Sequence, residues 1–212
     1  MPEILLESTL ETLIMLGVST LVGIVIGLPL GVLLHITDRG GLSRNRTLNL
    51  SVGFIINGIR SIPYIILVIA LIPVTRLLVG SSIGTMAASV PLSIAAIMLI
   101  VRIVEDSLRT VPYGLVEAAL SMGATRMQIV CKILIPEALP GMVSGATLVI
   151  ISLIGFSAMA GAVGGGGLGD LAIRYGYQRY NTEVIVEVVI ILGVMVQLVQ
   201  VTGDRLSKKL RK

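Results

Sequence analysis

The sequence has few of the residues on which most enzymes and nucleic-acid-binding proteins depend. Its 212 residues include no Trp, one Cys and one His, and only 3% are aromatic and 13% charged. The lone Cys131 excludes a disulfide within the chain, and one cysteine with one histidine, His35, argues against a catalytic or metal-binding constellation. Because aromatic rings for stacking bases are scarce, we expect no nucleic-acid partner, although the net charge is +4.

Apolar residues are abundant instead and occur in long runs. Hydrophobic residues make up 55% of the chain, and a helix needs about 20 consecutive apolar residues to cross a hydrocarbon core of about 30 Å. The sequence therefore predicts an all-α integral membrane protein, a single transmembrane domain over residues 1–212 with five transmembrane helices. The predicted spans are 12–34, 52–74, 83–101, 139–163 and 184–202.

Small residues recur at helical spacing in two of these runs. Ser19, Gly23, Gly27 and Gly31 stand four residues apart, so they form a stripe along one side of the first helix. Gly141 and Gly145, followed by Ala146, predict a second face of this kind in the fourth span. Such stripes let helices approach closely in lipid, so we expect each to contact a neighbouring helix.

The basic residues predict the orientation of the chain in the membrane. With five spans and the N-terminus outside, twelve Lys and Arg residues fall in inner segments and three in outer segments. The positive-inside rule favours this orientation, which places the C-terminus and residues 110–136 in the cytoplasm. The N-terminal segment has Glu3, Glu7 and Glu11 but no basic residue before the first run, so we expect no cleaved signal peptide.

Residues 110–136 are the one polar, helix-compatible stretch between long apolar runs. The sequence predicts a helix over 113–122, a turn at Gly123, where a residue without Cβ is suited to a sharp bend, and a second helix over 125–134 closed by Pro136. The predicted apolar faces are Leu115, Ala118, Ala119 and Met122 on the first helix, and Met127, Val130 and Leu134 on the second.

Six residues of this stretch resemble a known motif. Glu117, Ala118, Ala119, Gly123, Ile133 and Pro136 stand at the spacing of the EAA loop of ABC-importer permeases, with Ile135 where the family usually has Leu. The resemblance implies a cytoplasmic coupling helix between the third and fourth transmembrane helices, docked on an ATP-binding subunit. The alternative is a surface amphipathic hairpin without a special role.

Further segments resemble the methionine-uptake permeases within this family. They are Arg60–Leu67, Ser157–Met159, Tyr175–Tyr177 and Tyr180–Asn181. The resemblance implies a permease subunit, without ATPase or catalytic motifs, in the cytoplasmic membrane of a bacterium. Two copies would form the path for methionine, L and D, two partner ATPase subunits would hold ATP and Mg²⁺, and an extracytoplasmic binding protein would deliver the solute. The residues expected to line the path are Ser61, Tyr64, Ser157 and Met159.

Several alternatives remain open at this stage. Arg60 either reaches the membrane surface or belongs to the transport path, and the glycine run of residues 164–167 is expected to form a mobile outer segment or a gate hinge rather than a phosphate-binding loop. The tyrosines near residue 177 either anchor the membrane interface or contact solute or an external partner. An importer of another small solute, such as an osmolyte or a phosphonate, is the nearest rival function, and a secondary transporter is a more distant one.

Overall fold

The computed structural model describes residues 2–210. This part of the chain forms α-helices and two π-helical turns, with no strand. The elements are α1 (Pro2–Thr37), α2 (Arg46–Arg60), α3 (Tyr64–Ala70), α4 (Ile72–Val79), α5 (Thr85–Arg109), α6 (Tyr113–Ser121), α7 (Arg126–Ile129), η1 (Val130–Leu134), α8 (Ile135–Gly161), α9 (Gly167–Leu171), η2 (Ala172–Tyr177) and α10 (Thr182–Leu210).

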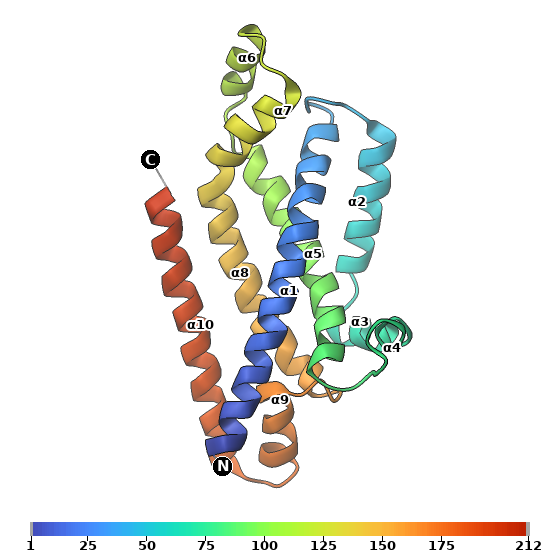
Figure 1. The fold of residues 1–212 in the computed structure, drawn as a ribbon, viewed down its shortest axis with the longest axis vertical. Helices are drawn as coiled ribbons and strands as arrows, with labels where there is room; N and C mark the ends of the chain where they lie inside the picture. The colour runs from blue at the N-terminus through green and yellow to red at the C-terminus, as the bar shows by residue number, and fades with distance from the viewer. Residues whose placement is uncertain (1, 211–212) are drawn as a thin grey trace.

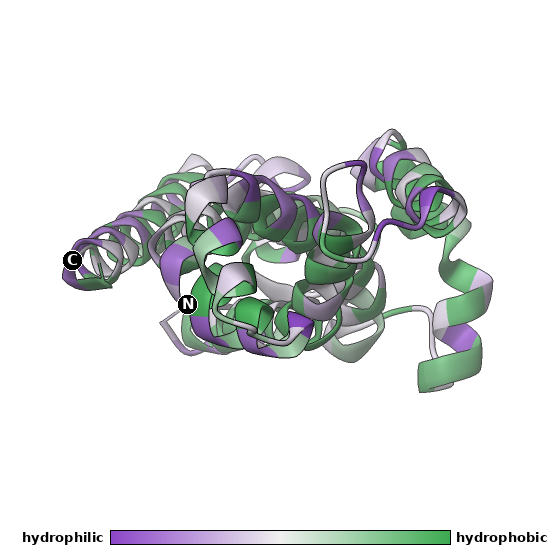
Figure 2. Ribbon diagram, turned by 90° about the horizontal axis from the view of Figure 1, so that it is seen from above, coloured by the Kyte–Doolittle hydropathy of each residue, from purple (hydrophilic) through white to green (hydrophobic). Residues whose placement is uncertain are grey.

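The long helices α1, α5, α8 and α10 run along the longest axis of the molecule, and α6 and α7 extend beyond them at one end (Figure 1). We call this end the tip end. The C-terminus of the described chain lies toward it, whereas the N-terminus and α9 lie at the opposite end. Viewed from the tip end, α4 projects sideways from the bundle (Figure 2).

Within residues 2–210, four helical segments are each long and apolar enough to cross a membrane: α1, α5, the continuous helix from Arg126 to Gly161, and α10. They contain most of four of the five predicted spans. The predicted span 52–74 is divided into α2, α3 and α4, and α2 and α3 meet at an angle of 102°, so together they can count only as one broken span. Pro63 ends the first helix, since proline disfavours helical backbone in the residue before it. Pro73 begins α4 instead of kinking a longer helix.

The predicted glycine stripe of α1 is confirmed as a helix-packing face, and its partner is α5. A Cβ added at Gly23 would lie 2.8 Å from the Cβ of Ala96, and one at Gly31 would lie 2.7 Å from the Cβ of Val104. The two backbones therefore approach more closely than any larger residue would permit. Because a helix of the same chain covers the stripe, the stripe does not require a second subunit.

Helix α8 packs on a neighbouring face of α5 through its own small residues. A Cβ on Gly141 would lie 3.3 Å from the Oγ of Ser107, and Gly145 faces Ile103. The fourth predicted span begins at residue 139, but α8 starts one turn earlier and contains Pro140. The backbone oxygen of Pro140 accepts a hydrogen bond of 2.9 Å from Ser207, which attaches α10 to α8.

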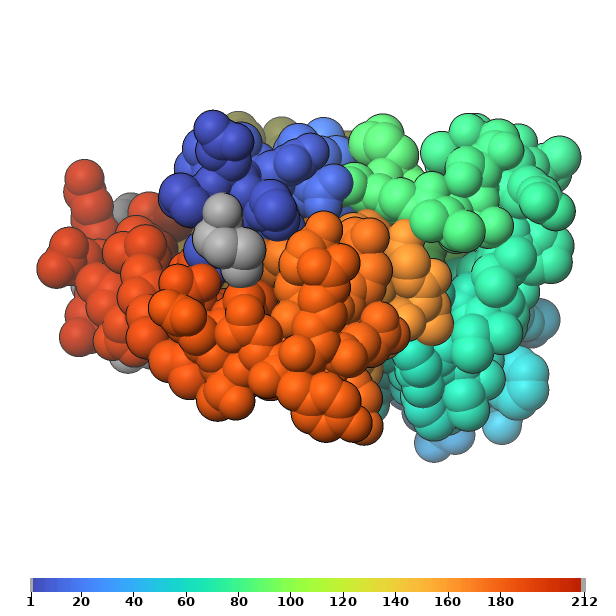
Figure 3. All heavy atoms as spheres, turned by 90° about the horizontal axis from the view of Figure 1, so that it is seen from below, coloured from blue at the N-terminus to red at the C-terminus, as the bar shows by residue number. Residues whose placement is uncertain are grey.

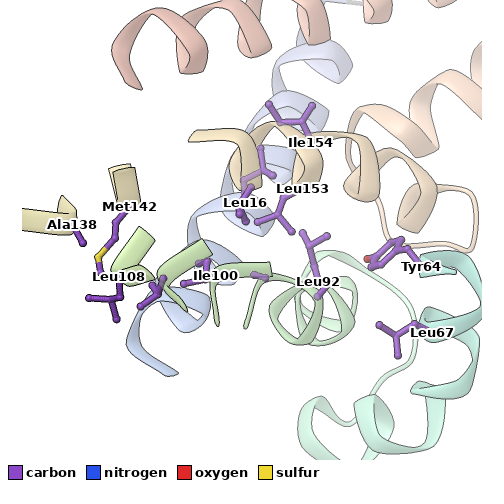
Figure 4. Close-up of a cluster of buried hydrophobic side chains, with 14 of the residues drawn as sticks. Leu16, Tyr64, Leu67, Leu92, Ile100, Leu108, Ala138, Met142, Leu153 and Ile154 are labelled. Carbon is purple, nitrogen blue, oxygen red and sulfur yellow. The ribbon is translucent and has the colours of Figure 1, made fainter. Parts of the chain in front are cut away.

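Helix α5 is the centre of the bundle. In its most apolar window 72% of the residues are buried, against 11% in that of α10, which packs mainly on α8 at the edge. The side chains of Leu92 on α5 and Leu153 on α8 are fully buried, and they meet Leu16 of α1 and Tyr64 of α3 in the same cluster (Figure 4). Truncating a buried leucine of this kind to alanine costs about 2 to 5 kcal/mol in soluble proteins.

The glycine-rich segment is anchored at the opposite end of the bundle. It lies beside the beginning of α1, where Figure 3 shows the orange residues against the blue ones. Glu11 accepts a hydrogen bond of 2.6 Å from the backbone N–H of Gly167, and Thr12 accepts one of 2.9 Å from that of Leu168. Gly164, like Gly167, has a positive φ, and its carbonyl accepts a hydrogen bond from Gly84. The expectation of a mobile segment or hinge finds no support in this geometry, which ties the run to α1 and α5.

Candidate functional site

The tip end is a bent pair of short helices. Helix α6 ends at Ser121, and Gly123 has φ +80°, a backbone conformation that costs a residue with a side chain about 1 to 2 kcal/mol. Helix α7 then begins with a capping box. The Oγ of Thr125 accepts a hydrogen bond of 3.3 Å from the backbone N–H of Gln128, and the side-chain oxygen of Gln128 accepts one of 2.8 Å from the backbone N–H of Thr125. The turn predicted at Gly123 is therefore confirmed. The second helix of the pair, α7, has four residues and continues directly into η1.

The residues of the apolar faces predicted for the tip divide between buried and exposed positions. Helix α6 buries Val116 and Ala119, whereas Leu115 and Met122 point outward. On the second helix Val130 and Leu134 are buried, whereas Met127 is 72% exposed. Both helices thus bury only a narrow side, and their larger apolar side chains form an exposed surface. We call this the tip surface; it consists of Tyr113, Leu115, Leu120, Met122 and Met127.

Pro136 does not close the second helix, contrary to prediction. The chain continues from α7 through the π-helical turn η1 into α8, and Pro136 stands in the first turn of α8. A proline lacks the N–H that an α-helix would use and clashes with the carbonyl four residues earlier. A π-helical turn just before it widens the helix at this point. The tip is consequently joined to a membrane helix by continuous helical backbone.

The six motif residues occupy different environments. Ala119 is 2% exposed and packs in the core cluster, and Ile133 is half-buried against it. Glu117, Ala118, Gly123 and Pro136 are exposed. Within the described part of the chain, the side chain of Glu117 forms no hydrogen bond and no ion pair. The motif therefore combines an inner part that attaches the tip to the bundle with an outer part available to another molecule.

Polar contacts that the sequence did not predict connect the tip to the loop between α1 and α2. Arg126 of α7 donates a hydrogen bond of 3.2 Å to the Oγ of Ser43. Arg109, at the end of α5, lies 3.1 Å from Asp38 in the same loop and 2.7 Å from Glu105. The side chain of Glu105 is 8% exposed and also pairs with Arg102 at 2.9 Å. The mixed-charge cluster was visible in the sequence, but its partner Asp38 stands 71 residues away from Arg109.

A large cavity of about 800 Å³ lies beside this ion-pair cluster. It runs between α2 and the second half of α5, and its wall combines apolar side chains such as Phe54 with Asn49, Asn57 and the Arg102–Glu105 pair. We call it the α2–α5 cavity. A broad cavity with polar groups on an otherwise apolar helical surface is suited to a hydrated passage for a small solute.

The four residues expected to line a path do not converge on one point. Ser61 is exposed at the break between α2 and α3, and its Oγ donates to the carbonyl of Gly58 at 2.7 Å. Ser157 is buried and donates to Ile154 of its own helix at 2.8 Å, and Met159 is half-exposed. Of the four, Tyr64 lines a cavity of about 120 Å³, together with Phe156, which the sequence analysis missed.

The opposite end carries charges that are paired within the chain. Arg174 forms an ion pair with Asp170, and this hydrogen bond raises the pKa of Arg174. Arg179 stands over the ring of Tyr175 at 4.2 Å, a cation–π contact, while Tyr177 and Tyr180 are exposed. Residues 2–210 contain no cluster of three His, Cys, Asp or Glu side chains that could hold a metal ion.

Together these features define a helical membrane protein with an exposed apolar tip on a continuous helix and a wide, partly polar cavity behind it. That is the class of membrane-embedded permease subunits. Residues 12–212 match the family described as "binding-protein-dependent transport system inner membrane component", and the chain belongs to this family.

The named relatives match most of the chain. It is 49% identical to the "Probable D-methionine transport system permease protein MetI" of Vibrio cholerae over 207 residues, which cover 98% of this chain and 92% of the relative. It is 52% identical to the D-methionine transport system permease protein MetI of Escherichia coli K12 over 158 residues, or 74% and 73% of the two chains.

Solved transporter structures have the same fold. A chain from "Inward facing conformations of the MetNI methionine ABC transporter" superposes with a TM-score of 0.98 at 49% identity, covering 100% of this chain and 98% of that one. A chain from an amino acid ABC transporter crystallised with histidines superposes with a TM-score of 0.81 at 20% identity, covering 98% and 94% of the chains, which establishes the fold alone.

Proposed function

We propose that this chain is the permease subunit of an ATP-driven methionine importer and takes up both L- and D-methionine. One observation carries the proposal: the chain matches, over its full length and at 49% identity, a chain in a solved structure of the MetNI methionine ABC transporter. Relatives named as D-methionine permeases match over up to 98% of its length. The fold likeness to an inward-facing structure also supports reading the α2–α5 cavity as the passage in its inward-open form.

The tip surface is the proposed docking site for an ATP-binding subunit. Its side chains are large, apolar and exposed, with Met122 at 81%, on an element that projects beyond the membrane helices. Contiguous exposed apolar side chains on such an element are typical of protein interfaces. ATP and Mg²⁺ would be held by that partner, and this chain would contribute no catalytic residue.

The proposed orientation places the tip and the C-terminus in the cytoplasm and the N-terminus outside. Twelve of the sixteen Lys and Arg residues belong to segments that this orientation places inside. The glycine-rich segment and the exposed Tyr177 and Tyr180 would then face the extracytoplasmic side. That surface is where a substrate-binding protein would dock.

A second copy of the chain would complete the passage. The break at residues 61–63 is exposed and non-helical, although apolar helices flank it on both sides. Irregular backbone at membrane depth is tolerated only where it meets protein or a water-filled space. Phe54 of α2 and Leu77 of α4 are also among the most exposed apolar side chains. A twofold axis along the membrane normal would bring these faces of two subunits around one path.

The ion-pair cluster suggests how the ATP-binding subunits would change the conformation of the passage. ATP binds the closed form of the ATPase dimer more tightly than the open form. ATP binding therefore raises the population of the membrane-domain conformation that accompanies closure. A movement of the tip would pass directly into α8, because their backbone is continuous. It would also pass through Arg126 and Ser43 to the loop after α1, and from Asp38 through Arg109 to α5.

The test is uptake by the complete system. The chain is purified with its ATP-binding subunits and binding protein, reconstituted in proteoliposomes, and supplied with radiolabelled L- or D-methionine, glycine betaine or a phosphonate. We expect uptake of both methionine enantiomers that requires enclosed ATP. Uptake of the osmolyte or the phosphonate in place of methionine, or methionine uptake without the ATP-binding subunits, would refute the proposal.

A further inference from the structure

An apolar groove runs between α1 and α10, and α8 forms its floor. Its volume is about 480 Å³, and every residue that lines it is uncharged. In Figure 1, α1 and α10 are close together near the N-terminus and diverge toward the tip end, with α8 between them. We call it the α1–α10 groove; its wall includes Gly17, Leu21 and Ile24 of α1, Ile154 of α8, and Leu198 and Val199 of α10.

The chain itself leaves this groove open. A Cβ added at Gly17 would meet no atom of a neighbouring helix within 4 Å, unlike one at Gly23 or Gly31 of the same helix. Leu21 and Leu198 are exposed, although both belong to helices that are long and apolar enough to cross a membrane. Packing within the chain therefore gives no reason for a glycine at position 17, and the groove has room for another apolar group.

The groove lies away from the face proposed for the second copy. That face includes the exposed Phe54 of α2 and Leu77 of α4. Figure 1 shows α2 and α4 on one side of the bundle and α10 on the opposite side. An assembly of two copies through α2 and α4 leaves the groove in contact with the bilayer.

Basic side chains continue the α10 wall of the groove toward the tip end. Residues at i, i+7 and i+11 lie on one side of a helix, so Leu198 is followed on its own side by Arg205 and Lys209. Both basic side chains are exposed, and neither forms an ion pair within residues 2–210. The neighbouring Asp204 faces another side of the helix, where it accepts a hydrogen bond of 3.0 Å from Gln200.

The packing of α10 on α8 determines which of its residues remain on the outside. The Oγ of Ser207 donates a hydrogen bond of 2.9 Å to the backbone oxygen of Pro140. Gly203, one turn earlier, approaches Thr147 of α8 too closely for any side chain. Because Gly203 and Ser207 face α8, Arg205 and Lys209 lie on the exposed side of α10.

We infer that the α1–α10 groove and the basic end of α10 together bind an anionic phospholipid from the leaflet on the tip side of the membrane. One acyl chain lies in the groove, and the phosphate contacts Arg205 and Lys209. At about 30 Å³ for each water-sized group, the groove holds about sixteen groups, the size of one acyl chain.

The charges favour a lipid over a polypeptide as the occupant. Basic residues just beyond a membrane helix attract anionic headgroups, and a phosphate accepts strong charge-assisted hydrogen bonds from arginine. A further membrane helix would fill the apolar groove without satisfying the two cations at its end. The inference concerns the lipid surroundings of the permease and goes beyond the proposed transport of methionine.

The experiment measures lipid binding to the permease, purified in detergent with its ATP-binding subunits and depleted of lipid. Native mass spectrometry counts bound molecules as dioleoyl-phosphatidylglycerol or dioleoyl-phosphatidylcholine is added. We expect phosphatidylglycerol to bind about tenfold or more tightly than phosphatidylcholine, and the double variant Arg205→Gln/Lys209→Gln to lose this preference. Gly17→Phe fills the groove, so it should weaken the binding of dioleoyl-phosphatidylglycerol but not that of the short-chain dihexanoyl form.

Matched variants separate this site from general effects. Arg44→Gln/Arg46→Gln removes two exposed cations from the segment after α1 and should keep the preference for phosphatidylglycerol. Gly193→Phe changes an exposed glycine of α10 that has open space around it and lies outside the groove, so it should bind both lipids as the wild type does. If Gly17→Phe does not assemble with the ATP-binding subunits, Gly17→Leu occupies the same space with a smaller side chain and should have the same effect.

Three results would overturn the lipid site. The first is equal binding of the two dioleoyl lipids by the wild type. The second is an equal loss of preference in the Arg44/Arg46 and Arg205/Lys209 double variants, which would show an effect of total charge alone. The third is a photo-reactive benzoylphenylalanine at position 21 that crosslinks in membranes to a polypeptide instead of a lipid. Methionine uptake is measured separately, and normal uptake with any of these results rejects the lipid site alone.

Discussion

Glu11 accepts a hydrogen bond of 2.6 Å from the backbone N–H of Gly167, a residue 156 positions later in the chain. The bond joins the first helix to the glycine-rich segment at the end opposite the tip. The bond places a carboxylate against the N–H groups of a glycine-rich turn. Turns of this kind bind anions through their N–H groups, and here the anion is a side chain of the same protein.

Replacing Glu11 should loosen this junction. We expect Glu11→Ala to lower the free energy of unfolding by about 1.5 to 3 kcal/mol, the usual range for a hydrogen bond to a charged group. Thermal unfolding in detergent measures the loss. Glu7→Ala, an exposed glutamate one helical turn earlier, is the matched control and should leave the melting temperature unchanged. Equal melting temperatures for the two variants would contradict the assigned role.

Gly123 is the second position where backbone conformation decides the outcome. Its φ of +80° strains any residue with a Cβ, and a β-branched residue most of all. Gly123→Val should still insert into the membrane but should lose about tenfold or more of ATP-driven uptake, because the bend presents the tip surface. Gly114→Val is the control, since that glycine lies within α6 with φ outside the left-handed region and open space around it. Normal transport by Gly123→Val would remove this account of the bend.

The tip surface can be tested without disturbing the fold. Met122 is 81% exposed, so Met122→Asp should leave unfolding unaffected while it weakens association with the ATP-binding subunit. A charge placed in an apolar contact must be desolvated without a partner, which costs several kcal/mol. Co-purification and ATPase activity measure the effect, and Met122→Leu should behave like the wild type. A normal complex with the aspartate variant would place the docking site elsewhere.

The sequence predicts features that depend on local pattern and misses those that depend on distant partners. The glycine spacing in α1 and the conformation of Gly123 were predictable, because each follows from a few neighbouring residues. Pro136 is predicted to close a helix, but it lies in the first turn of α8 after the π-helical turn η1, a position where its missing N–H costs little. The stack of Tyr64 on Phe156 joins residues from α3 and α8, and no sequence spacing indicates it.

Glu105 holds two arginines at the base of the tip. Its side chain is 8% exposed, and it lies 2.9 Å from Arg102 and 2.7 Å from Arg109. Glu105→Gln leaves both cations without their shared anion, but both are more than a third exposed, so solvent reduces the cost to about 1 to 2 kcal/mol. We expect the larger effect on the coupling ratio of methionine imported per ATP hydrolysed. Asp106→Asn, which removes an exposed carboxylate 3.4 Å from Arg102, should retain the wild-type ratio.

Tyr64→Phe should stabilise the protein. Within the described part of the chain the hydroxyl of Tyr64 is buried without a partner, so its removal relieves a desolvation penalty of about 1 to 3 kcal/mol and should raise the melting temperature in detergent. Tyr177→Phe, at an exposed ring, is the matched control and should leave the melting temperature unchanged. A Tyr64→Phe variant that melts at a lower temperature than the wild type would show that the hydroxyl has a partner within the protein.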